Sequence, residues 1–458
     1  MLNNVFATWG TSVDGKTIRG IRLGSARAGI RQHTGMPHLE GAHASEPDAG
    51  KMDNREDLTL IEMAEGTRTA AVFTRNAFRA APVHVARRHL DTRNPRFLLI
   101  NSGNANAGTG DRGLVDAMTS CKIVAGYADC PPEAVLPFST GVIGETLPMA
   151  CIRRGIADAY RDLGADGWTR AARAIMTTDT VPKWVSRTVD TAAGPLTITG
   201  IAKGSGMIRP DMATMLAFVA TDAPVAPAPL RHALTRAVDR SFHRVTVDGD
   251  TSTNDACVLM ATGMAHIPVI DDIRTDAWDA FRQGVTDVCE ALAKALIRDG
   301  EGATKFITIE VQGGKSQAEC DRVAFAVAHS PLVKTAFFAA DPNWGRILAA
   351  VGRAGLSDLD IGKVRITLVP QATDTSFDNR QRPIDSRGDH PPRAAPDDVC
   401  IVASGMRAQA YTEEQGQRVM QAPDITVRIA LGRGMENTLV WTCDLSHEYV
   451  RINAEYRT

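Results

Sequence analysis

A threonine at the mouth of an apolar run is the residue of this sequence best placed to do covalent chemistry. Thr214 follows a small residue, Ala213, and precedes the run Met215–Ala220. Gly204 and Gly206 give the preceding segment conformational freedom. Such a hydroxyl can attack its own preceding carbonyl and form an ester, which water then cleaves. The freed α-amine, with an ordinary pKa of about 7.7–8.0, becomes the base that an internal threonine lacks. The same pattern also fits an ordinary strand that starts with threonine.

Other stretches resemble known nucleotide-binding or metal-binding motifs only in part. Residues 108–113 match G-x-G-x-x-G, but a polar stretch, residues 102–107, separates them from the preceding apolar run, and no well-placed acid follows. A glycine-rich turn fits them better than a nucleotide site. Residues 300–305 lack the order of a P-loop. The stretch that begins at residue 248 resembles a calcium loop but has no glycine at the sixth position and no glutamate at the twelfth. The chain contains neither H-E-x-x-H nor G-x-S-x-G.

A mixture of strands and helices must position these residues. Apolar runs bounded by turn residues predict strands at 58–63, 69–73, 97–100, 196–201, 215–220, 306–311, 364–369 and 425–430. Apolar residues at helical spacing predict helices at 152–163, 226–238 and 278–297. Strands mixed with helices indicate an α/β or α+β protein with covered sheets.

Two stretches have the composition of insertions. Residues 31–55 are rich in glycine, proline, histidine and charge, and residues 371–398 are polar and rich in proline, arginine and aspartate. Neither has a periodic apolar pattern, so both are predicted to be surface loops. A lid is a second interpretation, because long loops are often functional.

Composition narrows the class of protein. The 458 residues allow two or three domains, and 51 basic residues against 53 acidic ones leave a formal net charge of −2. This balance argues against a general nucleic-acid binder. No apolar stretch approaches the roughly 18 residues of a membrane span, and the first residues lack the pattern of an export signal.

The eight cysteines form no C-x-x-C pair and have no histidines at zinc-site spacing. Reduced thiols are therefore expected, which favours a cytoplasmic protein. A zinc site or a disulfide framework is not indicated.

Long, spaced motifs make the chain resemble a known family. It resembles the glutamate N-acetyltransferases, also called ornithine acetyltransferases, of arginine biosynthesis. The matching stretches are INSGNANAGTG (100–110), FSTGVIGE (138–145), TTDT (177–180), AKGSGMIRPDMATMLAF (202–218), TVDGDTSTND (246–255), RDGEGATKF (298–306), DPNWGRI (341–347) and YVRINAEYRT (449–458).

The resemblance implies a precursor that cuts itself between Ala213 and Thr214. The products are an α chain, residues 1–213, and a β chain, residues 214–458, which form one intertwined fold and assemble as α2β2. The implied fold is α/β (α+β). Its mixed sheets pack face to face under helices, with a smaller C-terminal lobe, as in the related aminopeptidases.

By the same resemblance, Thr214 is the nucleophile. It takes the acetyl group from N2-acetyl-L-ornithine, and the acetyl-threonine then passes this group to the amine of L-glutamate in a ping-pong scheme. Thr140 and Gly141 correspond to the pair that donates hydrogen bonds to the oxyanion. One such donor lowers a barrier by about 2.7–4 kcal/mol.

Six positions correspond to substrate-binding residues of the family: Thr177, Lys203, Thr214, Glu301, Asn453 and the terminal Thr458. A lysine suits a substrate carboxylate, and a glutamate suits a substrate ammonium. Thr178 stands next to Thr177, and counting along the motif does not separate the two.

The chemistry needs no metal or organic cofactor, because the threonine supplies the nucleophile and its own amine the base. Expected partners are small amino acids. Use of acetyl-CoA as a second acetyl donor stays open, since family members with one and with two activities share these motifs. One alternative is an N-terminal-threonine amidohydrolase or aminopeptidase of the related fold, which releases acetate without glutamate. Another is a non-catalytic scaffold, which stays uncut.

Overall fold

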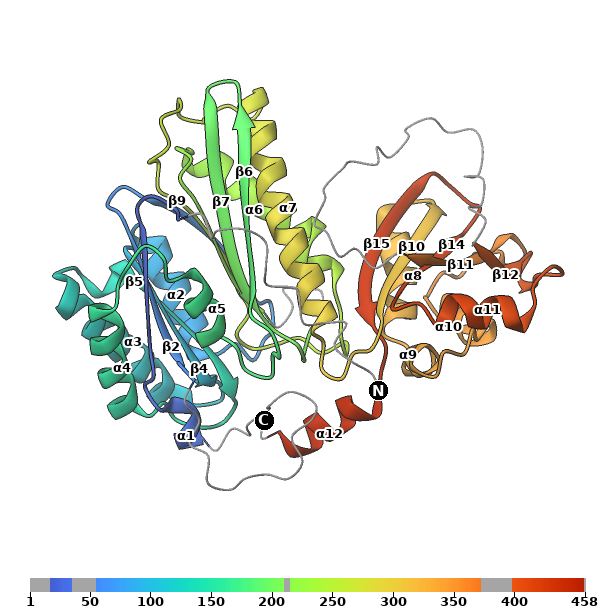
Figure 1. Cartoon of the computed structure of the whole chain (residues 1–458), viewed down its shortest axis with the longest axis horizontal. Coiled ribbons are helices and arrows are strands. Elements are labelled where there is room, and N and C mark those ends of the chain that lie inside the picture. The colour runs from blue at the N-terminus through green and yellow to red at the C-terminus, as the bar shows by residue number, and fades with distance from the viewer. Residues whose placement is uncertain (1–16, 35–54, 210–214, 372–397, 457–458) are drawn as a thin grey trace. The chain divides into compact units, whose positions relative to one another are not determined.

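The computed structural model describes residues 17–34, 55–209, 215–371 and 398–456 (Figure 1). The chain divides into two compact units. One comprises the residues up to Glu301 together with those from Arg451 on, and the other runs from Gly302 to Val450.

The first unit contains two sheets. The four-stranded sheet has the order β1-β2-β4-β5, with bounds Ile21–Ala26, Leu58–Met63, Phe97–Asn104 and Val135–Val142. The five-stranded sheet has the order β3-β9-β8-β7-β6, with bounds Arg68–Phe73, Ala256–Ala261, Leu216–Thr221, Gly194–Lys203 and Lys183–Thr191. Two pairs, β4 with β5 and β8 with β9, are parallel, so both sheets are mixed.

The two sheets pack face to face. Apolar side chains of β2, β4 and β5 form one buried cluster with those of β7, β8 and β9, and Phe138 meets Phe218 edge to face with ring centroids 5.1 Å apart. The alternation of inward and outward residues along a strand places every second side chain in this layer. The sequence expectation of face-to-face mixed sheets is confirmed.

Helices cover the outer faces of both sheets (Figure 1). On the four-stranded sheet these include α3 (Gly110–Ala128) and α4 (Met149–Arg161), which share a second buried cluster with β2 and β4. The five-stranded sheet carries α6 (Pro227–Arg240) and α7 (Asp276–Arg298). The remaining helices of this unit are α1 (Ile30–Thr34), α2 (Ala81–Thr92) and α5 (Trp168–Ala174).

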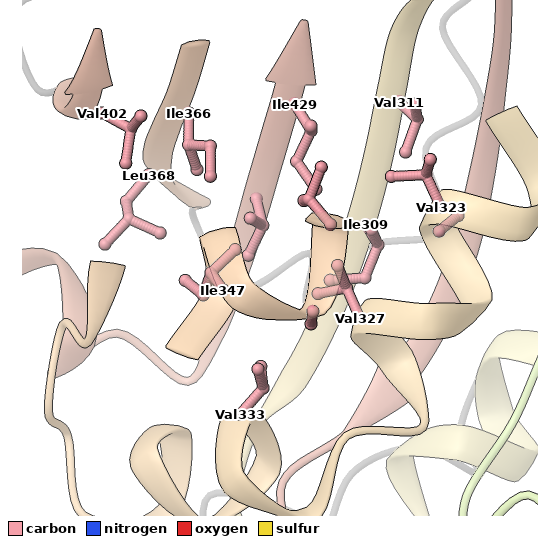
Figure 2. Packing of buried hydrophobic residues seen from close by; sticks show 14 of the residues in the cluster. Ile309, Val311, Val323, Val327, Val333, Ile347, Ile366, Leu368, Val402 and Ile429 are labelled. Carbon is pink, nitrogen blue, oxygen red and sulfur yellow. The ribbon is translucent and has the colours of Figure 1, made fainter. Parts of the chain in front are cut away.

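The second unit is a six-stranded sheet with helices packed on it. Its order is β13-β12-β11-β14-β10-β15, with bounds Met406–Arg407, Val399–Ala403, Arg365–Gln371, Asp424–Ala430, Phe306–Gly314 and Glu436–Cys443. Its helices are α8 (Gln317–Ala328), α9 (Pro331–Phe338), α10 (Trp344–Gly352) and α11 (Glu413–Met420). Figure 2 shows Ile309 and Ile429 of the sheet facing Val327 of α8 in the core between them. Helix α12 (His447–Glu455) leads the chain back to the first unit.

Strand and helix predictions hold closely, with three corrections. The polar stretch 102–107 is not a loop throughout, because β4 continues to Asn104. The predicted glycine-rich turn at 108–113 is helical from Gly110 on, because α3 begins there. The stretch 31–55 is not a surface loop at its start, because Arg31 lies in α1 and is only 2% exposed. Residues 35–54 and 372–397, which make up most of the two predicted insertions, lie outside the described residues.

All eight cysteines are free thiols. Within the described ranges, every helix is too short or too polar to span a bilayer.

Candidate active site

A small cavity of about 80 Å3 opens in the first unit, where the ends of β5 and β7 meet several loops. Its lining residues are Ala105, Thr140, Gly141, Ile143, Thr177, Thr178, Lys203, Gly206, Met207, Ser252, Thr253, Asn254, Glu301, Asn453 and Tyr456. These come from both sides of residue 213 in the sequence. Pockets for drug-sized ligands are typically about 300–1,000 Å3, so this cavity suits a small chemical group.

Thr140 and Gly141 reach the cavity from the end of β5. Gly141 has φ +132°, and a Cβ there would lie 2.3 Å from the carbonyl carbon of Gly103, so only glycine fits. The Asn254 amide holds this edge by donating to the carbonyls of Ser139 (2.8 Å) and Ala105 (2.7 Å). The backbone next to Thr140 is therefore fixed from two sides.

Lys203 ends β7 and lies opposite Leu216, the first residue of β8. Its side chain is buried, and its Nζ donates to the Thr140 hydroxyl oxygen at 3.2 Å. Because that oxygen accepts from the ammonium, the hydroxyl proton of Thr140 is free to point elsewhere. Burial lowers the pKa of Lys203, while the carboxylates of Asp179 and Glu301 oppose this shift.

Glu301 presents its carboxylate on another wall of the cavity. It follows α7, a helix that Thr275 caps by accepting from the Trp278 amide at 3.2 Å. The carboxylate accepts from the Thr178 hydroxyl at 2.7 Å and from the Asn453 amide at 2.8 Å. These two bonds join three distant parts of the sequence at one charged group.

The Glu301 carboxylate occupies the space that a side chain at position 206 would fill. A Cβ at Gly206 would lie 2.4 Å from the Glu301 carboxyl carbon. The next residue, Met207, has φ +55°, which is uncommon outside glycine. The amide of Met207 donates to Asp248 at 2.6 Å, and burial raises the pKa of this carboxyl to about 6.

The structure distinguishes the two neighbouring threonines. Thr178 uses its hydroxyl on Glu301 and also meets the Ser205 hydroxyl at 2.6 Å. Among the described residues, the Thr177 hydroxyl has no hydrogen-bond partner, although it lines the cavity. Thr177 is therefore the better placed of the two to meet a substrate.

A buried charge network lies behind the cavity. Lys183 Nζ contacts Asp179 Oδ1 at 2.5 Å and Asp299 Oδ2 at 2.6 Å. Burial alone would raise the pKa of Asp179, but Lys183, Lys203 and a backbone amide together hold it below its ordinary value. Asp179 thus remains ionised although it is buried.

Six of the predicted site residues come together at this cavity: Thr140, Gly141, Thr177, Lys203, Glu301 and Asn453. Ala213, Thr214 and Thr458 lie outside the described residues. The residue that follows Thr214 in the chain, Met215, is described, and its amide donates to Asp255 Oδ1 at 3.1 Å. Burial raises the pKa of Asp255 well above its ordinary value.

Sequence reasoning missed the residues that support the site. Asn254 and Asp179 both lie in stretches that carry the family resemblance, TVDGDTSTND and TTDT, and this was the only available signal. Asp299 lies in RDGEGATKF, another of these stretches, whereas Lys183 lies outside all of them and gave no signal, because lysine is mostly exposed in proteins.

The arrangement combines three capabilities. A buried ammonium and a hydroxyl donor can stabilise negative charge, a carboxylate can hold an ammonium group, and the small cavity limits access of water. These features suit a reaction at the carbonyl of a small amino-acid derivative.

Comparisons with known proteins agree with this chemistry. The model of the ArgJ family matches residues 43–458. An arginine biosynthesis bifunctional protein ArgJ from Methylococcus capsulatus is 53% identical over 441 residues, which cover 96% of each chain.

Two solved structures are also similar. The arginine biosynthesis bifunctional protein argJ of Bacillus halodurans is 34% identical, with 52% of this chain and 98% of that chain covered and a TM-score of 0.44. An ornithine acetyltransferase from Mycobacterium tuberculosis, solved as a complex with ornithine, is 32% identical, with 43% and 93% covered and a TM-score of 0.36. The family match and the 53% identity confirm the resemblance carried by the motifs, and this chain belongs to the ArgJ family, the glutamate N-acetyltransferases of arginine biosynthesis.

Proposed function

We propose that this protein transfers the acetyl group of N2-acetyl-L-ornithine to L-glutamate through an acetyl ester on Thr214. The observation that carries the proposal is the convergence of Thr140, Lys203 and Glu301 on one small cavity in a chain of the ArgJ family. Lys203 also lies opposite Leu216, two residues after Thr214 in the chain.

In the first half-reaction, the Thr214 hydroxyl attacks the acetyl carbonyl while its α-amine takes the hydroxyl proton. Thr140 and Gly141 donate to the oxygen that becomes negative. The C–N bond then breaks, the proton passes to the departing nitrogen, and ornithine leaves. In the second half-reaction, the amine of glutamate attacks the ester, and the Thr214 oxygen leaves and regains a proton.

Substrate binding follows from the charges of the cavity. Glu301 suits the ammonium group of an amino acid, and Lys203 suits a carboxylate or the developing oxyanion. Asn453 steadies the Glu301 carboxylate through its 2.8 Å bond, and Thr177 offers a hydroxyl to the substrate. Thr458 completes the set by its correspondence to the family position.

The mature enzyme in this proposal arises by self-cleavage between Ala213 and Thr214. The Thr214 hydroxyl attacks the Ala213 carbonyl, the peptide becomes an ester, and water hydrolyses it to leave a free α-amine on residue 214. The resulting α and β chains, residues 1–213 and 214–458, assemble as α2β2 in the cytoplasm. The free state of all eight cysteines supports a reducing compartment.

A second activity is acetylation of glutamate by acetyl-CoA. The relative from Methylococcus capsulatus is named as bifunctional, which supports a second donor here. Family membership at 53% identity favours acetyl transfer over the alternative of an N-terminal-threonine amidohydrolase or aminopeptidase.

The direct test incubates the purified protein with N2-acetylornithine, with and without glutamate, and follows ornithine and N-acetylglutamate by mass spectrometry. Acetyl transfer predicts stoichiometric N-acetylglutamate, and N-terminal sequencing of the β chain should read TMLAF. Release of free acetate at the same rate without glutamate would instead show a hydrolase. Acetyl-CoA as sole donor tests the second activity.

A further inference from the structure

Asp179 is a buried carboxylate that does not itself line the cavity. It is 2% exposed, and its two oxygens accept from groups on three segments. Oδ2 accepts from the Thr177 amide at 3.0 Å. Oδ1 accepts from the Gly204 amide at 2.7 Å and from Lys183 Nζ at 2.5 Å. One side chain therefore ties the turn at Thr177 to the end of β7.

Both backbone groups belong to, or directly adjoin, residues that line the cavity. Thr177 lines it directly, and Gly204 follows Lys203, whose ammonium reaches Thr140. A shift of either backbone would move a side chain that faces the substrate. Positioning by a carboxylate that accepts two amide protons is strong, because such bonds are charge-assisted.

Asp179 also acts electrostatically on Lys203, and its negative charge raises the pKa of the Lys203 ammonium. The charged and titratable groups that act on Lys203 are Asp179, Lys183, Glu301 and Asp255, with Asp179 the strongest of the carboxyls. Lys183 repels the ammonium. Glu301 is shared with Thr178 and Asn453, and burial favours the neutral form of Asp255.

We propose that Asp179 is a positioning residue of the acetyl-transfer site, which fixes the Thr177 and Gly204 backbones and supplies the counter-charge of Lys203. This inference rests on the proposed function, because Lys203 and Thr140 act there on the acetyl carbonyl.

The charge of Lys203 decides which way the Thr140 proton points. An ammonium has only donors, so it gives a hydrogen bond to the Thr140 oxygen and leaves the hydroxyl proton for the oxyanion. A neutral amine has a lone pair and can accept that proton instead. Loss of the counter-charge at Asp179 therefore removes an oxyanion donor and lowers the rate of the chemical step.

The test is Asp179→Asn, which keeps the shape of the side chain and removes its charge. Single-turnover release of ornithine from N2-acetylornithine without glutamate isolates the first half-reaction, and only the self-cleaved fraction is compared. Removing an opposite charge from a close pair typically shifts a pKa by about 1–3 units. We expect the loss of rate at alkaline pH to begin about one unit lower or more.

Asp299→Asn is the matched control. Asp299 pairs with the same Lys183 at 2.6 Å but is not among the charges that act most strongly on Lys203. This variant should lose thermal stability and keep the pH profile of the unmodified enzyme. If the Asp179→Asn variant had the same dependence of rate on pH as the unmodified enzyme, the role of Asp179 would be overturned. An equal shift in the Asp179→Asn and Asp299→Asn variants would also overturn it.

Lys183→Gln is a second test, in which the pH profile should move in the opposite direction. It tests the proposal if Asp179→Asn does not fold. Lys183 disfavours the charge on Lys203, so its replacement should move the loss of rate at alkaline pH to a higher pH. A downward movement or none would contradict the proposal. An unmodified protein that releases no ornithine would contradict the proposed function itself, whereas an active enzyme with unmoved profiles contradicts only the role of Asp179.

Discussion

Replacing Thr140 with valine should slow the acetyl-transfer step without weakening substrate binding. Valine keeps the branched shape that suits strand β5 and removes only the hydroxyl. That hydroxyl is the group within 3.2 Å of Lys203 Nζ, and the residue is 7% exposed, so water does not readily replace it. Loss of one oxyanion donor costs about 2.7–4 kcal/mol, which lowers kcat by a factor of about 10²–10³.

Stability must be separated from catalysis in this variant. The lost hydroxyl leaves one buried bond of Lys203 unmade, a cost of about 1–3 kcal/mol that thermal unfolding measures. Steady-state assays of N-acetylglutamate formation then give kcat and KM for the folded enzyme. Thr140→Ser restores the hydroxyl and should recover most of the rate. A raised KM with unchanged kcat would refute an oxyanion role and assign Thr140 to substrate binding.

Three further outcomes are expected. Thr214→Ala should give one full-length band on a denaturing gel and no acetyl transfer, and cleavage of this variant between residues 213 and 214 would rule out Thr214 as the nucleophile. Gly206→Ala should push the Glu301 carboxylate aside, because the new Cβ would lie 2.4 Å from its carbon, and raise KM on the order of tenfold, equivalent to about 1.4 kcal/mol. The Asp248 carboxyl, whose pKa burial raises to about 6 from 3.8, binds more protons folded than unfolded at pH 4–6, so it lowers stability as pH rises through that window. Asp248→Asn should flatten this part of the curve of Tm against pH, and an unchanged slope would contradict the assignment.

The apolar pattern of the sequence was enough to place most strands. The predicted strand at 58–63 coincides with β2, because every residue but Glu62 is buried and the run is sharply bounded. Strand β4 was predicted too short, because it ends in polar residues. Its polar end is buried all the same, with Asn101 accepting from the Ser139 hydroxyl at 2.6 Å and Ser102 donating to the Ala174 carbonyl at 2.6 Å. Such pairing between distant segments leaves no periodic trace in one sequence.

The active-site prediction depended on motifs rather than on pattern. Alone, Lys203 or Glu301 is an ordinary charged residue, and only the family resemblance singled them out. The pairing of the supporting charges could not be predicted from the sequence, for a physical reason. Buried lysines and aspartates survive only when they pair, and the pairs here join positions as far apart as Lys183 and Asp299. Arg31 was misread for the same reason, since its buried guanidinium donates to the Ser102 hydroxyl at 2.9 Å.

The position of β8 within the five-stranded sheet has a consequence for the lifetime of a cut molecule. This strand begins two residues after Thr214 and is hydrogen-bonded on one side to β7, which precedes the proposed cleavage site, and on the other to β9, which follows it. Strand β3, also from before the cut, pairs with β9. Two chains that share one sheet in this way stay associated while the protein is folded. After unfolding they are separate molecules, and they can refold together only after a bimolecular encounter. In the proposed cut form, the chain therefore has to fold before it is cut, and refolding after thermal unfolding requires the two chains to associate again.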